Sequence, residues 1–281
     1  MVVHRPYLGG VWKALVAGLV VAAAVQVLLP RSWLCRAVGS RGGVEGGVRG
    51  SLLGVLTLMC SCCAAPVAVA LRRARSGLPA AVGFWLGNPA LNPVVLVLLL
   101  AVLPWQWAAL RLAAGVAVVA AGIGLARLEE RRSAIEGEPD VAEMAAPQGP
   151  LPLVYLRTLG GLAVRLLPEF LAVVFVLGAF RSQLFPMGET SGGTLVLVLA
   201  LVVAGLLLPI PTGGEVAVVA GILAAGLPVP AAAALLVTLP MLSLASLLMV
   251  RHAFPRRLLL RLSGVAAGAG LLAAAVMPTL V

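Results

Sequence analysis

The chain has 281 residues, of which 62% are hydrophobic and 11% are charged, whereas about a quarter of the residues in a soluble globular protein are charged. At about 20 residues for each membrane crossing, this length holds about eight to ten transmembrane helices and leaves little for a soluble domain. The sequence therefore predicts an all-α polytopic integral membrane protein.

The net charge of +10 comes from arginines that are grouped beside apolar runs rather than spread over one surface. Such groups set the orientation of membrane proteins under the positive-inside rule, and their spacing argues against nucleic acid as a partner. The one lysine, Lys13, does not lie in a phosphate-binding loop, so ATP hydrolysis is not expected. The groups are Arg72, Arg73 and Arg75; Arg127, Arg131 and Arg132; and Arg251, Arg256, Arg257 and Arg261.

The first transmembrane half is predicted over residues 1–127. Its first apolar run, from Ala14 to Leu29, resembles a signal peptide, but the many later apolar runs favour an uncleaved first helix. Residues 31–50 are rich in Gly and Arg and are expected to form a polar loop or a surface segment. A span over residues 52–71 follows, with Pro66 removing a backbone donor near its middle.

An interrupted helix is predicted from Leu78 to Leu103. Asn88 and Asn92 each precede a proline, and the helical conformation is disfavoured for a residue before proline. A helix over residues 108–126 closes the first half. The next segment, 128–154, holds most of the acidic residues and is expected to be a polar linker.

The second transmembrane half, residues 155–281, repeats the plan of the first. The run Val67-Ala68-Val69 corresponds to Val216-Ala217-Val218, and Gly77-Leu78-Pro79 corresponds to Gly226-Leu227-Pro228 at the same offset. Interrupted apolar segments at matching places in two halves indicate a transporter site near the middle of the bilayer. The pattern does not decide between parallel and inverted repeats. Counting Thr194 to Leu208 and Gly213 to Leu227 as separate crossings gives nine and places the last arginine group in the cytoplasm.

Cys60, Cys62 and Cys63 are the first candidate site residues. Thiols bind soft ions such as Cu(I), Zn(II) or As(III), and on a regular helix Cys60 and Cys63 share a face while Cys62 points elsewhere. The three converge only if the backbone unwinds near Pro66. Two alternatives stay open, because free cysteines also pack as small apolar residues and a Cys-x-x-Cys pair also serves redox chemistry. Cys35 stands alone and is given no role.

Asn88 and Asn92 are the next candidates, since their amides would either bind a substrate or only cap the two half-helices. Acidic residues inside apolar runs are expensive in a bilayer and suggest function. Glu215, beside the second interruption, is therefore the candidate for proton coupling, with an acid at a loop tip as the alternative. Glu169 lies four residues after Arg165, which favours a structural ion pair.

The order of these motifs resembles a known family. Cys60-Ser61-Cys62 with a proline four residues later, a basic turn and Asn88-Pro89-Ala90-Leu91-Asn92-Pro93 look like the predicted permeases related to the organoarsenical efflux permease ArsP. The resemblance covers most of the chain and implies a multi-pass protein of the bacterial inner membrane. The characterised arsenic branch exports trivalent methylated or aromatic arsenicals, with cysteines as ligands. Here the chain has Thr57-Leu58-Met59 where that branch has Thr-Pro-Phe, and Cys63 extends the cluster.

The sequence thus predicts a permease rather than an enzyme. It would work by alternating access and export trivalent organoarsenicals or another thiophilic solute in exchange for protons. Its expected partners are a small-molecule or metalloid substrate and the lipid bilayer, with no cofactor and no bound metal. The alternatives are a permease or channel for an unrelated solute, a membrane thiol oxidoreductase, and a structural or chaperone-like subunit.

Overall fold

A computed structural model describes residues 43–73, 76–136, 150–161, 163–164, 193–208, 210, 213–224, 226 and 228–281, with the isolated positions 20 and 27. In these ranges all regular structure is helical, and four segments have the length and apolar composition of membrane spans. This confirms the predicted all-α polytopic membrane architecture. Most of the predicted first helix and of the helix over 155–180 lies outside the described residues, as do Cys35, Arg165 and Glu169. The four spans are Leu78–Val102, Trp105–Arg132, Val229–Val250 and Arg256–Leu280.

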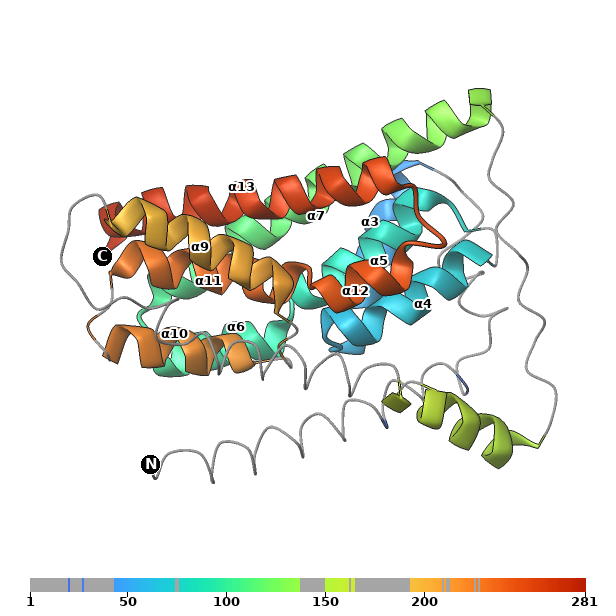
Figure 1. The fold of residues 1–281 in the computed structure, drawn as a ribbon, viewed down its shortest axis with the longest axis horizontal. Helices are drawn as coiled ribbons and strands as arrows, with labels where there is room; N and C mark the ends of the chain where they lie inside the picture. The colour runs from blue at the N-terminus through green and yellow to red at the C-terminus, as the bar shows by residue number, and fades with distance from the viewer. Residues whose placement is uncertain are drawn as a thin grey trace.

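Helices α3 (Val44–Thr57) and α4 (Ser61–Arg73) form a hairpin whose two outer ends lie at the same end of the molecule (Figure 1). They have 14 and 13 residues, fewer than the about 20 that a crossing needs. Both pack on α5 (Leu78–Ala90), α3 in the same direction as α5 and α4 in the opposite direction. The hairpin therefore enters the bundle and turns back halfway.

The sequence reading was wrong about this hairpin in two respects. Residues 44–50, expected in a loop, begin α3, and residues 52–71, expected to be one span, are divided at Leu58–Cys60. Leu58 has a φ of 50°, in the left-handed region where a helix ends. Pro66 does not unwind the chain but lies inside α4.

Glycines explain why α3 forms despite its loop-like composition. Gly50 and Gly54 face α5, whereas Gly47 faces Ile123 of α7, and a Cβ atom on Gly50 would collide with the carbonyl oxygen of Ala80. Small residues at this spacing let two helix backbones approach closely, which favours association within a membrane. The contact with α5 therefore stabilises a helix that its composition alone would disfavour.

Gly50→Ala is expected to lower the stability of the folded protein by about 1–3 kcal/mol, because the added methyl group overpacks a helix contact against a backbone atom. Gly124→Ala in α7 is the matched control, since nothing lies within 4 Å of its position. Thermal unfolding of the detergent-purified protein measures both. Equal transition temperatures for the two variants would contradict the packing described here.

The predicted interruption of the next span is present at Leu91 and Asn92, between α5 and α6 (Pro93–Val102). The following helix, α7 (Trp105–Glu136), continues beyond its predicted end into the acidic segment. Two acidic residues of this extension contact other helices: Glu130 Oε1 accepts a hydrogen bond from Leu78 N at 2.8 Å, and Glu129 Oε2 pairs with Arg261 Nη1 at 3.3 Å. These partners explain why the helix extends into a stretch that reads as a linker.

The later helices follow the same order of long and short elements. Helices α9 (Gly193–Leu207) and α10 (Gly214–Ala224) form a second hairpin that enters from the end opposite to the first and turns back (Figure 1). They have 15 and 11 residues, too few for the two separate crossings considered above. Then follow α11 (Val229–Met241), α12 (Leu244–Val250) and α13 (Arg256–Leu280), with a second helix interruption at Leu242–Ser243.

Helices α5 and α11 form the centre of the bundle. All 13 residues of α5 are buried, as are most residues of α11, and the two helices contact each other. Short helices from one part of the chain pack against short helices from the other part: α4 contacts α12, and α10 contacts α6. The hairpin of each part thus lies against the interrupted helix of the other part.

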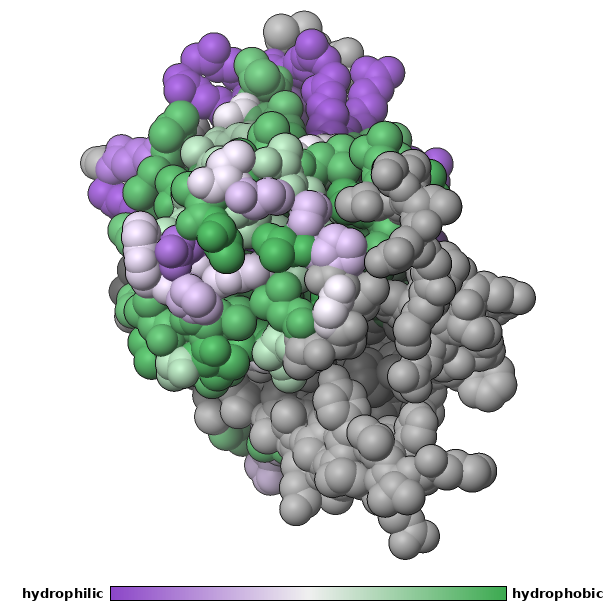
Figure 2. Space-filling view, turned by 90° about the vertical axis from the view of Figure 1, so that its left-hand side faces the viewer, coloured by the Kyte–Doolittle hydropathy of each residue, from purple (hydrophilic) through white to green (hydrophobic). Residues whose placement is uncertain are grey.

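The described arginines of the basic groups lie at one end of the bundle, which we call the basic end (Figure 1). Arg72 Nη1 donates to Ser76 O at 3.3 Å just before α5 begins, and the Glu129–Arg261 pair joins the end of α7 to the beginning of α13. Figure 2 shows one face of the molecule, on which apolar side chains cover much of the described surface and hydrophilic ones gather along the upper edge. That face is the end of the bundle opposite to the basic end (Figure 1). Along the long helices, large apolar side chains such as Leu112, Leu260 and Leu272 are exposed, and an apolar lateral surface of this kind is what a bilayer requires.

Candidate functional site

The turn between α3 and α4 carries the cysteines. Cys60 precedes the first turn of α4, and its carbonyl oxygen accepts from Ala64 N at 3.0 Å. Cys60 Sγ lies 3.0 Å from Cys63 Sγ, with Cys60 partly exposed and Cys63 buried. The buried Cys62 points elsewhere, and its Sγ lies 3.2 Å from the hydroxyl of Ser243 at the second helix interruption. Two thiols therefore face each other, while the third contacts the other part of the chain.

Asn88 holds this turn in place. Its side-chain oxygen accepts from Met59 N at 2.6 Å and its nitrogen donates to Thr57 Oγ1 at 2.7 Å, so both ends of the amide are engaged. Asn88 is fully buried in α5. The sequence reading offered two roles for it, substrate ligand or cap at the break, and the contacts in the structure are instead those of a clamp on the cysteine turn.

Asn88→Leu is expected to lower the free energy of unfolding by about 1–3 kcal/mol for each buried polar group that loses its partner, and to loosen the cysteine turn. Alkylation of Cys60 by a maleimide should then become several-fold faster. Thr57→Val is the control, because it removes only one of the two hydrogen bonds. If Asn88→Leu were no more destabilising and no more reactive than Thr57→Val, Asn88 would not hold the turn.

Asn92 begins α6 as its N-cap, and its side-chain oxygen accepts from Val94 N at 3.0 Å. Its side chain is buried, and its amide nitrogen has no hydrogen-bond partner among the residues that the structure describes. Asn92 thus combines the capping role with a free donor at the first helix interruption.

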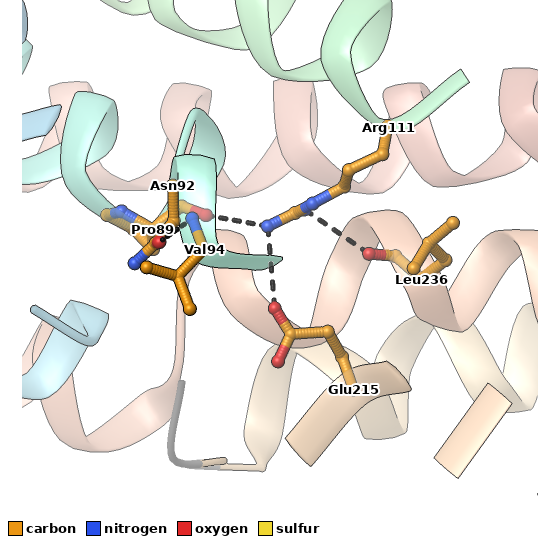
Figure 3. Close-up of polar contacts among 6 residues, drawn as sticks. All are labelled: Pro89, Asn92, Val94, Arg111, Glu215 and Leu236. Atoms are coloured by element: carbon orange, nitrogen blue, oxygen red, sulfur yellow. Dashed lines mark hydrogen bonds and ion pairs between the residues drawn. The ribbon is translucent and has the colours of Figure 1, made fainter. Parts of the chain in front are cut away.

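Glu215 lies in the first turn of α10 and is buried against Arg111 of α7, with 3.6 Å between Glu215 Oε1 and Arg111 Nη2. Figure 3 shows that Arg111 also points to two backbone oxygens, donating to Pro89 O at 2.6 Å and to Leu236 O at 3.3 Å. Both charged side chains are at most 2% exposed. Glu215 is therefore half of an interior ion pair rather than an acid at an exposed loop tip.

The sequence reading missed Arg111 and Ser243. A charge inside a membrane helix is a signal of function, and Arg111 follows six residues of a long apolar helix, so this signal was present. Nothing in the sequence marks Ser243, whose role comes from its contact with Cys62, 181 positions earlier in the chain.

The candidate site residues, with Arg111 and Ser243 added, form two clusters. The cysteine cluster comprises Cys60, Cys62, Cys63 and Ser243; the arginine cluster comprises Arg111 and Glu215 with the carbonyl groups of Pro89 and Leu236. The α5–α6 segment joins them, because Asn88 holds the cysteine turn and the neighbouring Pro89 accepts from Arg111. Among the described residues, no three side chains of the metal-binding types are grouped to hold an ion.

Comparison with known proteins identifies the family of the chain. Residues 7–278 match the ArsP_1 family, which is described as a predicted permease. The UPF0718 protein YraQ of Escherichia coli (strain K12) is 40% identical over 258 residues, which cover 90% of this chain and 73% of that protein. No solved structure is significantly similar to the chain. The match over nearly the full length, together with the membrane-spanning helices, shows that the chain is a multi-pass bacterial membrane protein and belongs to this predicted permease family.

Proposed function

We propose that this permease exports trivalent organoarsenicals, or another solute that binds thiols, in exchange for protons. The observation that carries the proposal is the pair of thiols of Cys60 and Cys63, 3.0 Å apart at the turn of a hairpin that ends inside the bundle. Soft thiolate ligands select thiophilic centres. In this proposal a solute in transit binds to the pair at this turn.

The number of thiols favours organoarsenicals over inorganic arsenite. A compound R–As(OH)₂ exchanges its two hydroxyl groups for the thiols of Cys60 and Cys63 and releases two water molecules. Arsenic then has its three bonds, one to carbon and two to sulfur. As(OH)₃ has a third position to fill, and the third thiol, that of Cys62, is directed to Ser243. A two-thiol site therefore suits the compound with one carbon substituent.

Alternating access is supported by the order of the helices. The series α3 to α7 and the series α9 to α13 each contain a hairpin, an interrupted helix and a long helix. The two series run in opposite directions, since α7 ends where α13 begins, at the Glu129–Arg261 pair. We interpret them as inverted repeats of one unit, with residues 1–127 and 155–281 as the two halves and 128–154 as the region between them. Transporters of this kind bind their substrates between the repeats, near the middle of the bilayer.

The arginine groups support the direction of transport. Positively charged residues near membrane helices face the cytoplasm, so the basic end is placed on that side, in the bacterial inner membrane. The cysteine hairpin then opens from the cytoplasm, and the α9–α10 hairpin opens from the other side. In this proposal Glu215, near the turn of the second hairpin, exchanges protons with the outside when the protein opens to that side.

Uptake into everted membrane vesicles tests the proposal. Native protein is expected to accumulate trivalent methylarsenic at least tenfold more than inorganic arsenite when the vesicle interior is acidic. Cys60→Ser and Cys63→Ser should each abolish the accumulation, because one thiol cannot form the dithiol adduct. Cys62→Ser should retain most of it, since Cys62 contacts Ser243 rather than the pair.

Each part of the proposal can be contradicted by a specific result. Equal loss in all three cysteine variants would contradict the two-thiol site, and accumulation that persists without a proton gradient would contradict proton exchange. Absence of accumulation by the native protein, with the protein folded in the vesicles, would remove arsenicals as the substrate and leave the family's permease function.

The same cysteine pair favours a membrane thiol oxidoreductase as the second candidate. The distance of 3.0 Å between Cys60 Sγ and Cys63 Sγ would allow the pair to cycle between dithiol and disulfide. Alkylation of thiols during turnover, followed by mass spectrometry, separates the two functions. A permease keeps both thiols reduced throughout transport, whereas an oxidoreductase accumulates the Cys60–Cys63 disulfide when its reductant is withheld.

A further inference from the structure

Two backbone carbonyl groups near the centre of the molecule lack their helical partners. In an α-helix the carbonyl of one residue accepts from the N–H four residues later. For Pro89 that residue is Pro93, and for Leu236 it is Pro240. Proline has no N–H, so neither carbonyl can be satisfied within its own helix. A buried carbonyl without a donor is costly, more so in a membrane, where water does not replace the missing partner.

Arg111 supplies both missing donors. Its Nη2 lies 2.6 Å from Pro89 O and its Nη1 lies 3.3 Å from Leu236 O, as Figure 3 shows. The guanidinium group suits this task because it presents several N–H donors in a rigid plane. Pro89 belongs to the first interrupted helix and Leu236 to the second, so one side chain connects the two.

Glu215 makes this arrangement possible in an apolar interior. A buried guanidinium group needs an opposite charge as well as hydrogen bonds, and Glu215 Oε1 lies 3.6 Å from Arg111 Nη2. With both carbonyls and the carboxylate engaged, Arg111 is held from three sides. This geometry suits a fixed structural connection better than a ligand for a passing solute.

We propose that Arg111 is the positioning residue of the transport site, which sets the separation of the two helix interruptions by donating to the carbonyls that Pro93 and Pro240 leave unpaired. The interruptions carry Asn92 and Ser243, and Ser243 contacts Cys62. Arg111 therefore determines where the cysteine turn lies relative to the second part of the chain. The inference rests on the proposed permease mechanism for its functional meaning, but its test needs no substrate.

The test measures the distance between the two parts through Cys62 and Ser243. The full-length protein with Cys35, Cys60 and Cys63 changed to Ser and with Ser243→Cys is oxidised by diamide in detergent. The Cys62 thiol and the new thiol then form a disulfide, because the two side chains are in contact in the native protein. The yield of this disulfide is compared between variants at Arg111 and Pro240.

Arg111→Met with Glu215→Gln removes the donors without leaving a buried carboxylate, and the yield is expected to fall several-fold. Adding Pro240→Ala provides an N–H for Leu236 O within α11, so thermal stability should recover in part while the yield stays low. This triple variant separates positioning from stability. Pro240→Ala alone, with Arg111 in place, is the control and should give the native yield.

Three results would overturn the proposal: a native yield in the Arg111→Met/Glu215→Gln variant, a yield that recovers together with stability in the triple variant, or an equal loss from Pro240→Ala alone. The first would show that Arg111 does not hold the interruptions together. The second would reduce its role to stability, and the third would assign the effect to proline. Because no arsenical takes part, failure of this test is distinct from failure of the proposed transport activity.

Discussion

Arg111→Met is expected to destabilise the folded protein by about 3–5 kcal/mol, which is enough to prevent recovery of folded protein from membranes. The substitution leaves the Glu215 carboxylate buried without its opposite charge, and it removes the donor from two carbonyls. Breaking a buried pair from one side is more costly than removing both partners, because the remaining charge has neither water nor a counter-ion. Adding Glu215→Gln should therefore recover part of the loss.

Folded yield by size-exclusion chromatography and thermal unfolding in detergent measure this effect. Arg257→Met is the matched control, since Arg257 is an exposed residue of α13 and surface substitutions change stability by about 0.5 kcal/mol or less. If Arg111→Met behaved like Arg257→Met, the ion pair and the two carbonyl bonds would contribute nothing to the fold.

Glu215→Gln is expected to abolish accumulation driven by a proton gradient while leaving downhill movement of the solute intact. Glutamine keeps the size and the polar oxygen of glutamate but cannot release a proton. Arg111 keeps its two carbonyl partners but loses its opposite charge, which lowers stability, so both assays are normalised to the amount of folded protein. The measurement compares gradient-driven uptake with counterflow exchange in everted vesicles. At least a tenfold loss of the first, with the second retained, is the expected result.

Glu45→Gln is the control for this variant, because Glu45 pairs with Arg49 at the surface of α3, where the two side chains are 55% and 44% exposed. It should transport as the native protein does. Gradient-driven accumulation that survives Glu215→Gln would exclude Glu215 as the proton carrier. Loss of both uptake and counterflow would instead assign Glu215 to the structural pair alone.

Much of the fold follows from composition and from proline. The apolar runs predicted the helical membrane class. Of the two Asn-Pro steps, Asn92-Pro93 marks the interruption at Leu91–Asn92, whereas Asn88-Pro89 lies inside α5 and does not break it. Helix α3 could not be predicted in this way. Its glycines indicate a loop when read alone and favour a helix only when α5 lies against them.

The site was predictable in its residue types but not in its contacts. Three cysteines within four positions and an acid in an apolar run identify Cys60, Cys63 and Glu215 as candidates from the sequence alone. Two contacts of the site depend on packing between the two parts of the chain. Cys62 contacts Ser243 because α4 packs against α12, and Glu215 reaches Arg111 because α10 packs against α6. Such packing joins residues more than a hundred positions apart, and no local pattern encodes it.

The pairing of Arg111 with Glu215 has an electrical consequence. Together the two side chains carry no net charge, so a rearrangement that moves them as a unit does no work against the membrane voltage. Once Glu215 is protonated, the pair carries one positive charge, and moving that charge across 100 mV is worth about 2.3 kcal/mol. The conformational change of the empty, ion-paired protein would therefore not depend on voltage. In the protonated form, the voltage would favour the conformation in which the positive charge lies closer to the negative interior of the cell.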